Sequence, residues 1–364
     1  MKPPPGYTND DRVCRLIKAI YGLKQSPRAS YQKLHDALLT TGFFHSHSDH
    51  SLFIRSTNTG IVLLVYNIIL TGSDTSGIED IKLYLKTVFD IKDLGPLQYF
   101  LGIEVTRDTN DIFLSQRKYI LDLLTETGKL GTKLVRTPLE EHFKDQREGE
   151  CLEHAEQYRR VVGKLIYLTI TRPHLSFIVH QVSQWIHAPT TSHWQIVDRI
   201  LKYLKGTPNK GLWMRNNNHT EIIGYCDADW AGDMMDLKST TGYCTFIGGN
   251  LVTWKSKKQT MVARSSAEAE YRARANTTSE IIWLKQLLKD FGIDSTQPVP
   301  LHCDNQAALH VAANSIFHER MKHIEVDCHF IYRENHKRDN ISDVHTKSRP
   351  TCRHLHQGDK LVCS

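Results

Sequence analysis

Residues 224–243 of this 364-residue chain read GYCDADWAGDMMDLKSTTGY, and they decide what the C-terminal half can fold into. Residues 221–226, EIIGYC, are typical of a strand that delivers Asp227 at its end, and residues 242–247, GYCTFI, are typical of a returning strand. A carboxylate at the tip of a buried strand is costly unless something compensates its charge, and a metal ion is the usual compensation. The stretch therefore predicts a sheet that carries a candidate metal ligand, Asp227, at one end.

Further acidic residues follow at domain-scale spacing: Glu270 in SSAEAEYRARA, Asp304 in LHCDNQAAL and Asp343 in NISDVHTK. Like Asp227, Asp304 stands at the end of an apolar strand pattern, where a purely structural role for a carboxylate is hard to find. Glu270 has a plainer alternative, because it could be an ordinary exposed residue of the long helix that starts near Ser265. These carboxylates stand as candidate ligands of one metal site.

Several motifs occur here in a fixed order: CDADWAGD, STTGYCTFIGGNLVTWKSKKQ, ARSSAEAEYRA, LHCDNQAAL and KHIEVDCHFI. Together they resemble the ribonuclease H domain of copia-type LTR retrotransposon polyproteins. The resemblance implies two Mg²⁺ ions held by Asp227, Glu270, Asp304 and Asp343, and cleavage of the RNA strand of an RNA–DNA hybrid. It also favours Glu270 over Glu268, whose spacing from Ser265 suits a capping box, because the family's E-x-x-A register falls on Glu270.

Residues 21–34, YGLKQSPRASYQKL, resemble the motif of copia-type reverse transcriptases that packs against template and incoming nucleotide. The resemblance implies nucleic-acid contacts by Lys24, Gln25 and Arg28. The residues alone leave a second interpretation open, that of a solvated basic helix.

The polymerase motif of the same family carries two aspartates on a tight turn after the segment LLVY, and these aspartates hold its metal ions. Residues 63–74 read LLVYNIILTGSD here, with only Asn67 at that position. Because a turn between paired strands needs at least about two residues, Tyr66 and Asn67 must form it or the strands stay unpaired. Asp74 and Asp80 lie beyond the second strand. We therefore expect no polymerase activity.

The fold predicted from these patterns is α/β, in four segments. Residues 1–135 correspond to a truncated reverse-transcriptase palm and thumb, and residues 136–220 to a linker and helical connection. Residues 221–347 correspond to an RNase H-like domain, and residues 348–364 are an unmatched tail. The family has a further strand before its D-x-x-T-K helix. Here HFIYRENHKRDNISDVHTK runs on without a β-branched segment, so we expect the last strand to be missing and Asp343 to lie on the last helix.

The composition limits the classes of function. A net charge of +6 and a pI near 8.8 permit an RNA–DNA hybrid or another nucleic acid as partner. Lys255, Lys257 and Lys258 could contact such a hybrid or belong to a solvated turn. The eight cysteines include no CxxC pair, which favours a reducing intracellular compartment, cytoplasmic or nuclear, over a disulfide framework. No signal peptide is recognisable, and the longest apolar run, residues 61–70, is shorter than the ~20 residues of a membrane span.

Three functional hypotheses remain open at this point. The first is a retrotransposon-derived fragment with an inactive polymerase and an impaired, Mg²⁺-dependent RNase H site. The second is a module that binds nucleic acid without cleaving it, and the third is a transposon relic without function. Loss of backbone beside both sites would favour the relic, because a chain retained for binding would keep its strands.

Overall fold

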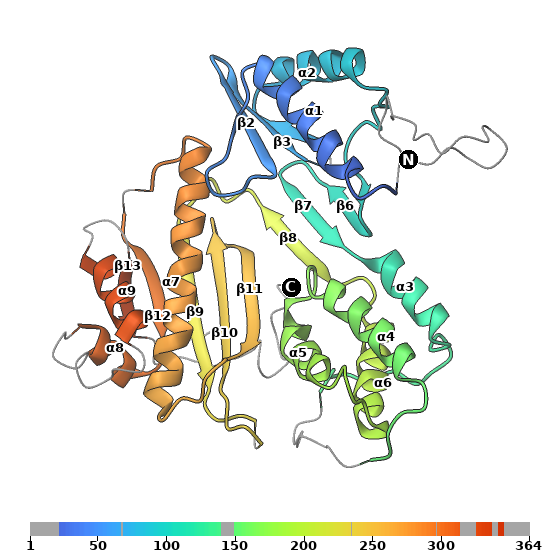
Figure 1. Ribbon diagram of the computed structural model, residues 1–364, viewed down its shortest axis with the longest axis vertical. Helices are drawn as coiled ribbons and strands as arrows, with labels where there is room; N and C mark the ends of the chain where they lie inside the picture. The colour runs from blue at the N-terminus through green and yellow to red at the C-terminus, as the bar shows by residue number, and fades with distance from the viewer. Residues whose placement is uncertain are drawn as a thin grey trace, which may run out of the picture. The chain divides into compact units, whose positions relative to one another are not determined.

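The computed structural model describes residues 22–66, 68–139, 149–233, 235–295, 297–313, 325–336 and 341–345. The chain forms two compact units: Met1–Gly95 with Gln286–Ile293, and Pro96–Lys285 with Asp294–Ser364. Figure 1 shows their helices and strands. The mixture of sheets and helices confirms the predicted α/β class. The tail 348–364 and residues 140–148 of the predicted linker lie outside the described residues.

The first unit is built on a four-stranded antiparallel sheet. Its strands, which neighbour one another in sequence order, are β1 (Phe44–His45), β2 (Leu52–Thr57), β3 (Gly60–Val65) and β4 (Ile69–Gly72). Helices α1 (Ser26–Thr40) and α2 (Thr75–Val88) share a core with the sheet. Val62 and Leu64 are fully buried while their neighbours are half-buried, so the first half of the apolar run 61–70 forms the half-buried strand β3.

For the connection between β3 and β4 the sequence allowed two outcomes, a turn that includes Tyr66 and Asn67 or unpaired strands. The strands are paired, with Val65 opposite Ile69, so the connection is three residues long. Ile68 closes it with a φ of 59°, and its N–H donates to the carbonyl of Val65 over 2.7 Å. A β-branched residue rarely adopts this left-handed conformation, so the connection is strained. Asn67 itself lies outside the described residues.

The second unit begins with another antiparallel sheet and a group of helices. The sheet is β5 (Tyr99–Phe100), β6 (Ile103–Arg107), β7 (Asp111–Ser115) and β8 (Gly211–Arg215), in that order. The helices are α3 (Arg117–Glu126), α4 (Ala155–Leu168), α5 (Ser176–Gln184) and α6 (Thr191–Gly206), and they share one apolar core. A helical connection was expected within residues 136–220, and α4, α5 and α6 lie there. The same segment also supplies β8, which pairs with β7.

A five-stranded mixed sheet forms the rest of the second unit. Its strands are β9 (Ile222–Asp229), β10 (Thr240–Ile247), β11 (Asn250–Lys258), β12 (Val299–Cys303) and β13 (Ile341–His345). Their order in the sheet is β11-β10-β9-β12-β13; β9, β10 and β11 pair antiparallel, and β12 runs parallel to both β9 and β13.

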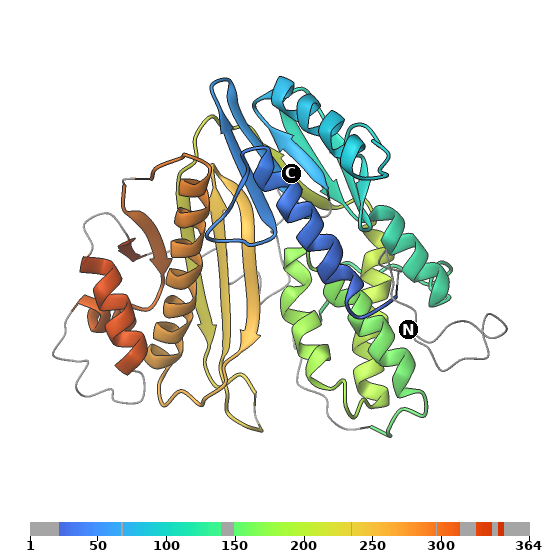
Figure 2. The same ribbon diagram turned by 45° about the horizontal axis from the view of Figure 1, so that its top comes forward.

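The long helix α7 (Ser266–Asp290) lies along this sheet (Figure 2), and helix α9 (Glu325–His336) packs beside it through the cluster Tyr271, Ala275, Cys328 and Ile331. Gly224 permits the close approach of α7, because a Cβ at this position would lie 2.7 Å from Cδ1 of Ile281. The glycine in the motif GYCD is thus explained by packing. Helix α8 (Gln306–Ala313) follows β12.

One expectation about this sheet is wrong. The last strand is present as β13, and it pairs in parallel register with β12, so that Ile341 faces Val299 and Asp343 faces Leu301. Asp343 therefore lies on a strand and not on a helix. Strand formation here depends on the pairing partner β12, which a local pattern such as ISDVH cannot reveal.

Buried histidines make the helical core of the second unit sensitive to acid. His174 is 4% exposed, and its Nε2 lies 3.0 Å from the Tyr203 hydroxyl. Burial, aided by the positive charges of Arg172 and Lys210, lowers the pKa of His174 to about 3. The unfolded chain binds the proton near pH 6.5 and the folded chain does not, so stability is fully present above that pH and is lost as the pH falls.

We expect the free energy of unfolding to fall by about 2 kcal/mol between pH 7.5 and pH 5 because of His174 alone. Urea unfolding at the two pH values measures this change. His174→Gln keeps an acceptor near Tyr203 but does not titrate, so this variant should lose about 2 kcal/mol less over the same interval. Equal losses in both proteins would contradict the assignment.

Candidate metal centre

The candidate centre is assembled at one end of the mixed sheet. Asp227 lies near the end of β9, 6% exposed, opposite Gly242 of β10. Asp304 follows the last residue of β12, which runs parallel to β9. Because parallel neighbours end at the same edge of a sheet, the two strands deliver their aspartates to one place. This is the placement that the strand patterns predicted.

The two candidate glutamates of α7 have different roles. The Glu268 N–H donates to Oγ of Ser265, and the Glu268 carboxylate accepts from the Arg264 N–H over 2.6 Å. Glu268 therefore caps the helix, in the manner of a capping box displaced by one residue. Glu270 lies two residues further on, 5% exposed, and its Oε1 accepts from the N–H of Ala228 on β9 over 3.1 Å. Only Glu270 faces the sheet edge.

A cysteine also belongs to the cluster. Donor atoms of Glu270, Cys303 and Asp304 all lie within 4.8 Å of one another. The Cys303 thiol is fully buried and donates toward Oε2 of Glu270 over 3.9 Å. Cys303 is a core residue, as its position in an apolar strand suggests. Its contact with Glu270 joins β12 to α7, and no local sequence pattern reports a contact between distant segments.

The electrostatics of the cluster are unfavourable without a cation. Burial first, and then the nearby charges of Cys303, Asp227 and Asp304, raise the pKa of Glu270 from 4.5 to about 10. The hydrogen bond from Ala228 works in the opposite direction but does not offset them. At neutral pH Glu270 therefore holds a proton that a divalent cation would displace.

Asp343 is not brought to the others by the strand register. Its backbone faces Leu301 of β12, and Leu301 in turn faces Gly224 of β9. Asp343 is therefore level with a residue three positions before Asp227, which corresponds to about 10 Å along the strand. The side chain of Asp343 lies outside the described residues.

The three lysines expected near a hybrid lie on strand β11 and not in a turn, so the solvated-turn interpretation is wrong. Lys255 and Lys257 lie two positions apart on the strand, and both are exposed. The Lys258 ammonium, by contrast, forms ion pairs with Asp233 and, over 2.9 Å, with Asp236.

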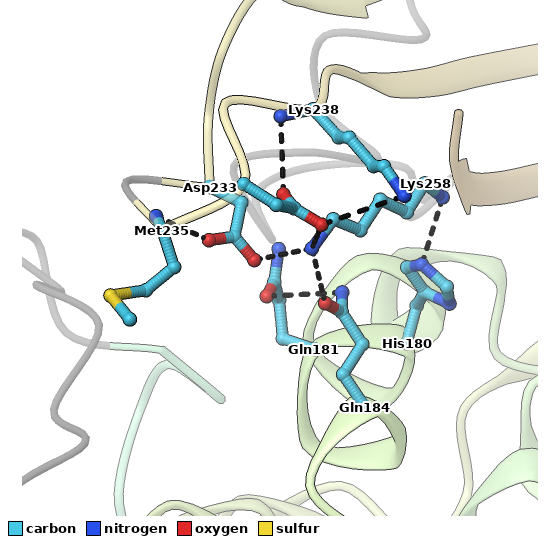
Figure 3. Close-up of polar contacts among 8 residues, drawn as sticks. His180, Gln181, Gln184, Asp233, Met235, Lys238 and Lys258 are labelled. Carbon is cyan, nitrogen blue, oxygen red and sulfur yellow. Dashed lines mark hydrogen bonds and ion pairs between the residues drawn. The ribbon is translucent and has the colours of Figure 1, made fainter. Parts of the chain in front are cut away.

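The remaining contacts of Lys258 join the loop after β9 to helix α5 (Figure 3). The Lys258 ammonium donates to Gln184 over 3.3 Å, and its backbone N–H donates to Nε2 of His180 over 2.9 Å. The charge of Lys258 is therefore already used within the protein, and it positions the loop that follows Asp227. Such long-range ion pairs were not visible in the motif WKSKKQ.

The residues of the reverse-transcriptase motif lie at the beginning of α1 in the first unit. Lys24 and Gln25 precede the helix and Arg28 is in its first turn, and all three are exposed. Gln25 is the N-cap residue, but its side chain makes no capping hydrogen bond. These positions leave all three side chains available to solvent.

The acidic residue nearest the β3–β4 turn has a structural role. Asp74 is the N-cap of α2 and accepts hydrogen bonds from Thr57 and Ser76 and from the Gly77 N–H, over 2.7–2.8 Å. These bonds, that of Thr57 first, hold the pKa of Asp74 well below its usual range. As expected, Asp74 lies beyond β4, and its carboxylate is occupied with capping.

Comparison with known proteins identifies the family of this chain. A family profile described as reverse transcriptase (RNA-dependent DNA polymerase) matches residues 1–141. The Pol polyproteins of the transposons RE2 and RE1 of Arabidopsis thaliana are 46% and 47% identical over 338 residues, which is 91% of this chain and 23% of theirs. The Pol polyprotein of transposon TNT 1-94 of Nicotiana tabacum is 36% identical over 349 residues, 91% of this chain and 26% of its own length.

The chain belongs to the copia-type retrotransposon Pol polyproteins, and it contains reverse-transcriptase sequence of that family. It spans about a quarter of the length of these relatives. Among the described residues, no helix is long and apolar enough to cross a membrane.

Removing the charge of Glu270 should stabilise the metal-free protein. Because the folded pKa is raised, this carboxyl group lowers the stability increasingly as the pH rises from about 4.5 toward 10. Glu270→Gln should therefore raise the free energy of unfolding at pH 7 by up to about 3 kcal/mol, as measured by urea unfolding in a chelating buffer.

The matched control is Glu280→Gln, ten residues further along α7, where the carboxylate accepts from the Tyr243 hydroxyl over 2.9 Å. This variant should give no gain in stability. A Glu270→Gln protein that is less stable than the parent without metal would show that Glu270 is a structural residue.

Proposed function

We propose that the second unit carries an RNase H-type nuclease site that cleaves the RNA strand of RNA–DNA hybrids with two Mg²⁺ ions. The observation that carries this proposal is the convergence of two buried residues, Asp227 and Glu270, with the half-buried Asp304 at one sheet edge. The sheet order β11-β10-β9-β12-β13, with three antiparallel strands and two parallel additions, supports it, as do the family motifs of residues 221–347. The presence of β13 weakens the relic hypothesis, because the sheet has kept its strands.

The donor set fits magnesium. Mg²⁺ prefers hard oxygen ligands at about 2.0–2.1 Å, so two ligands of one ion lie at most about 4.2 Å apart. The donor atoms of Glu270 and Asp304 are within 4.8 Å of each other, close to that limit. The raised pKa of Glu270 further indicates a place where added positive charge would relieve repulsion.

When bound, two such ions would activate the attacking water and neutralise charge on the leaving oxygen. Asp227 and Asp304 would hold them from two parallel strands, and Glu270 would give up its proton to join them. The Ala228 N–H fixes the Glu270 carboxylate toward β9, and the ion pairs of Lys258 fix the loop after Asp227. Asp343 is the fourth ligand implied by the family.

Exposed basic residues supply the proposed contacts to nucleic acid. Lys255 and Lys257 on β11 would meet the phosphates of the hybrid, and contacts to 2′-hydroxyls would give the preference for RNA. Lys24, Gln25 and Arg28 would contact nucleic acid in the first unit, as their motif implies. The free thiols of the described cysteines are compatible with a reducing, intracellular location.

The test is cleavage of a hybrid with labelled RNA by the full chain. We expect Mg²⁺-dependent cleavage that leaves a 3′-hydroxyl and a 5′-phosphate, and a loss of at least about 100-fold in Asp227→Asn, because a metal ligand is removed. Glu280→Gln, on the same helix as Glu270 but away from the cluster, should retain the parent rate.

Two results would overturn the nuclease proposal. If folded protein binds the hybrid but does not cut it, the non-catalytic binding module is correct. If cutting persists in Asp227→Asn, the activity comes from a contaminant or another site. Protein that fails to fold at all would support the relic hypothesis.

We further propose that the polymerase is inactive, since residues 66–68 connect β3 and β4 without a carboxylate and Asp74 caps α2. Extension of a labelled primer on an RNA or DNA template, with Mg²⁺ and all four deoxynucleotides, should give no product. Template-dependent extension that disappears on heating the protein would contradict this.

A further inference from the structure

We infer that Cys303 adds a thiolate to the carboxylate cluster and makes it a site for a thiophilic divalent cation such as Zn²⁺ or Cd²⁺. The inference rests on the proposed function for the role of Glu270 and Asp304, and it concerns which cations this chain's donor set selects. A cation held partly by sulfur would occupy the centre in place of Mg²⁺ and block cleavage.

The distances support a shared cation. A tetrahedral zinc site with Zn–S of about 2.3 Å and Zn–O of about 2.0 Å places its sulfur and oxygen about 3.5 Å apart. Sγ of Cys303 lies 3.9 Å from Oε2 of Glu270, so a shift of a few tenths of an ångström is sufficient. An Asp304 carboxylate oxygen lies within 4.8 Å of both atoms and supplies a third ligand.

The same contact fixes the direction of the sulfur. The fully buried Cys303 thiol points toward the Glu270 carboxyl group. A divalent cation that binds both groups as anions would displace the thiol proton of Cys303 and the carboxyl proton of Glu270. The Cys226 thiol on β9 donates to the backbone carbonyl of His302 over 3.5 Å and also lies within hydrogen-bond reach of the Cys303 thiol, so Cys226→Ser is the control for a second sulfur.

Ligand softness determines the selectivity. Thiolates favour Zn²⁺ and related soft ions, whereas Mg²⁺ gains nothing from sulfur. An all-carboxylate site has no such preference for thiophilic ions. Because of the Cys303 sulfur, a thiophilic cation can bind at this centre in place of Mg²⁺ and inhibit cleavage. It would share the carboxylate ligands Glu270 and Asp304 with Mg²⁺.

The experiment is a titration of the metal-stripped full chain with Cd²⁺, followed by the ultraviolet charge-transfer absorption of a cadmium–thiolate bond. This readout needs no cleavage. We expect the absorption to reach its plateau at one Cd²⁺ ion per chain and to become weaker in a large excess of Mg²⁺. In Cys303→Ser the absorption should be at least tenfold weaker than in the parent protein. Cys226→Ser and Cys151→Ser, which replaces an exposed cysteine, should absorb like the parent.

The inference would be overturned if the absorption persists in Cys303→Ser or disappears in Cys226→Ser alone. Absence of the absorption from the folded parent protein would overturn it as well. Glu270→Gln keeps the thiol but removes an oxygen ligand, so its Cd²⁺ affinity should fall at least tenfold. If Cys303→Ser does not fold, as judged by circular dichroism, unchanged affinity in Glu270→Gln overturns the inference. Cadmium absorption without Mg²⁺-dependent cleavage would refute the nuclease proposal alone.

Discussion

The repulsion among buried carboxylates at one edge of the mixed sheet is the constraint on which the second unit depends. Glu270 is almost fully buried and faces the charges of Asp227 and Asp304, so the cluster opposes folding unless a proton or a cation is added. The scaffold overcomes this repulsion with several fixed contacts. Gly224 lets α7 approach the sheet, the cap at Ser265 and Glu268 sets where the helix begins, and the Ala228 N–H holds Glu270.

The two units of the chain treat their acidic residues differently. In the second unit Asp227, Glu270 and Asp304 converge at one edge of the mixed sheet. In the first unit the β3–β4 turn has no carboxylate, and the Asp74 carboxylate accepts hydrogen bonds at the start of α2. The β3–β4 turn is strained, with Ile68 in the left-handed region.

Much of this arrangement could be predicted from the sequence, for identifiable physical reasons. Asp227 and Asp304 follow strand patterns whose parallel ends meet, and Ser265 with Glu268 forms a recognisable helix start. The errors concern interactions between distant segments. β13 is polar and short, and it is a strand because β12 is beside it. Lys258 resembles Lys255 in the sequence, but Asp233 and Asp236 neutralise it. Cys303 is a core residue, but its contact with Glu270 comes from a distant segment.

The central claim is that the buried carboxylates hold divalent cations, and direct counting of bound Mn²⁺ tests it most closely. Electron paramagnetic resonance of free Mn²⁺ gives the number of ions that the metal-stripped full chain binds. The account predicts two bound ions per chain and release of protons on binding, with at least one ion lost in Asp227→Asn. A folded protein that binds no Mn²⁺, or that binds equally well after Asp227→Asn, would contradict the account.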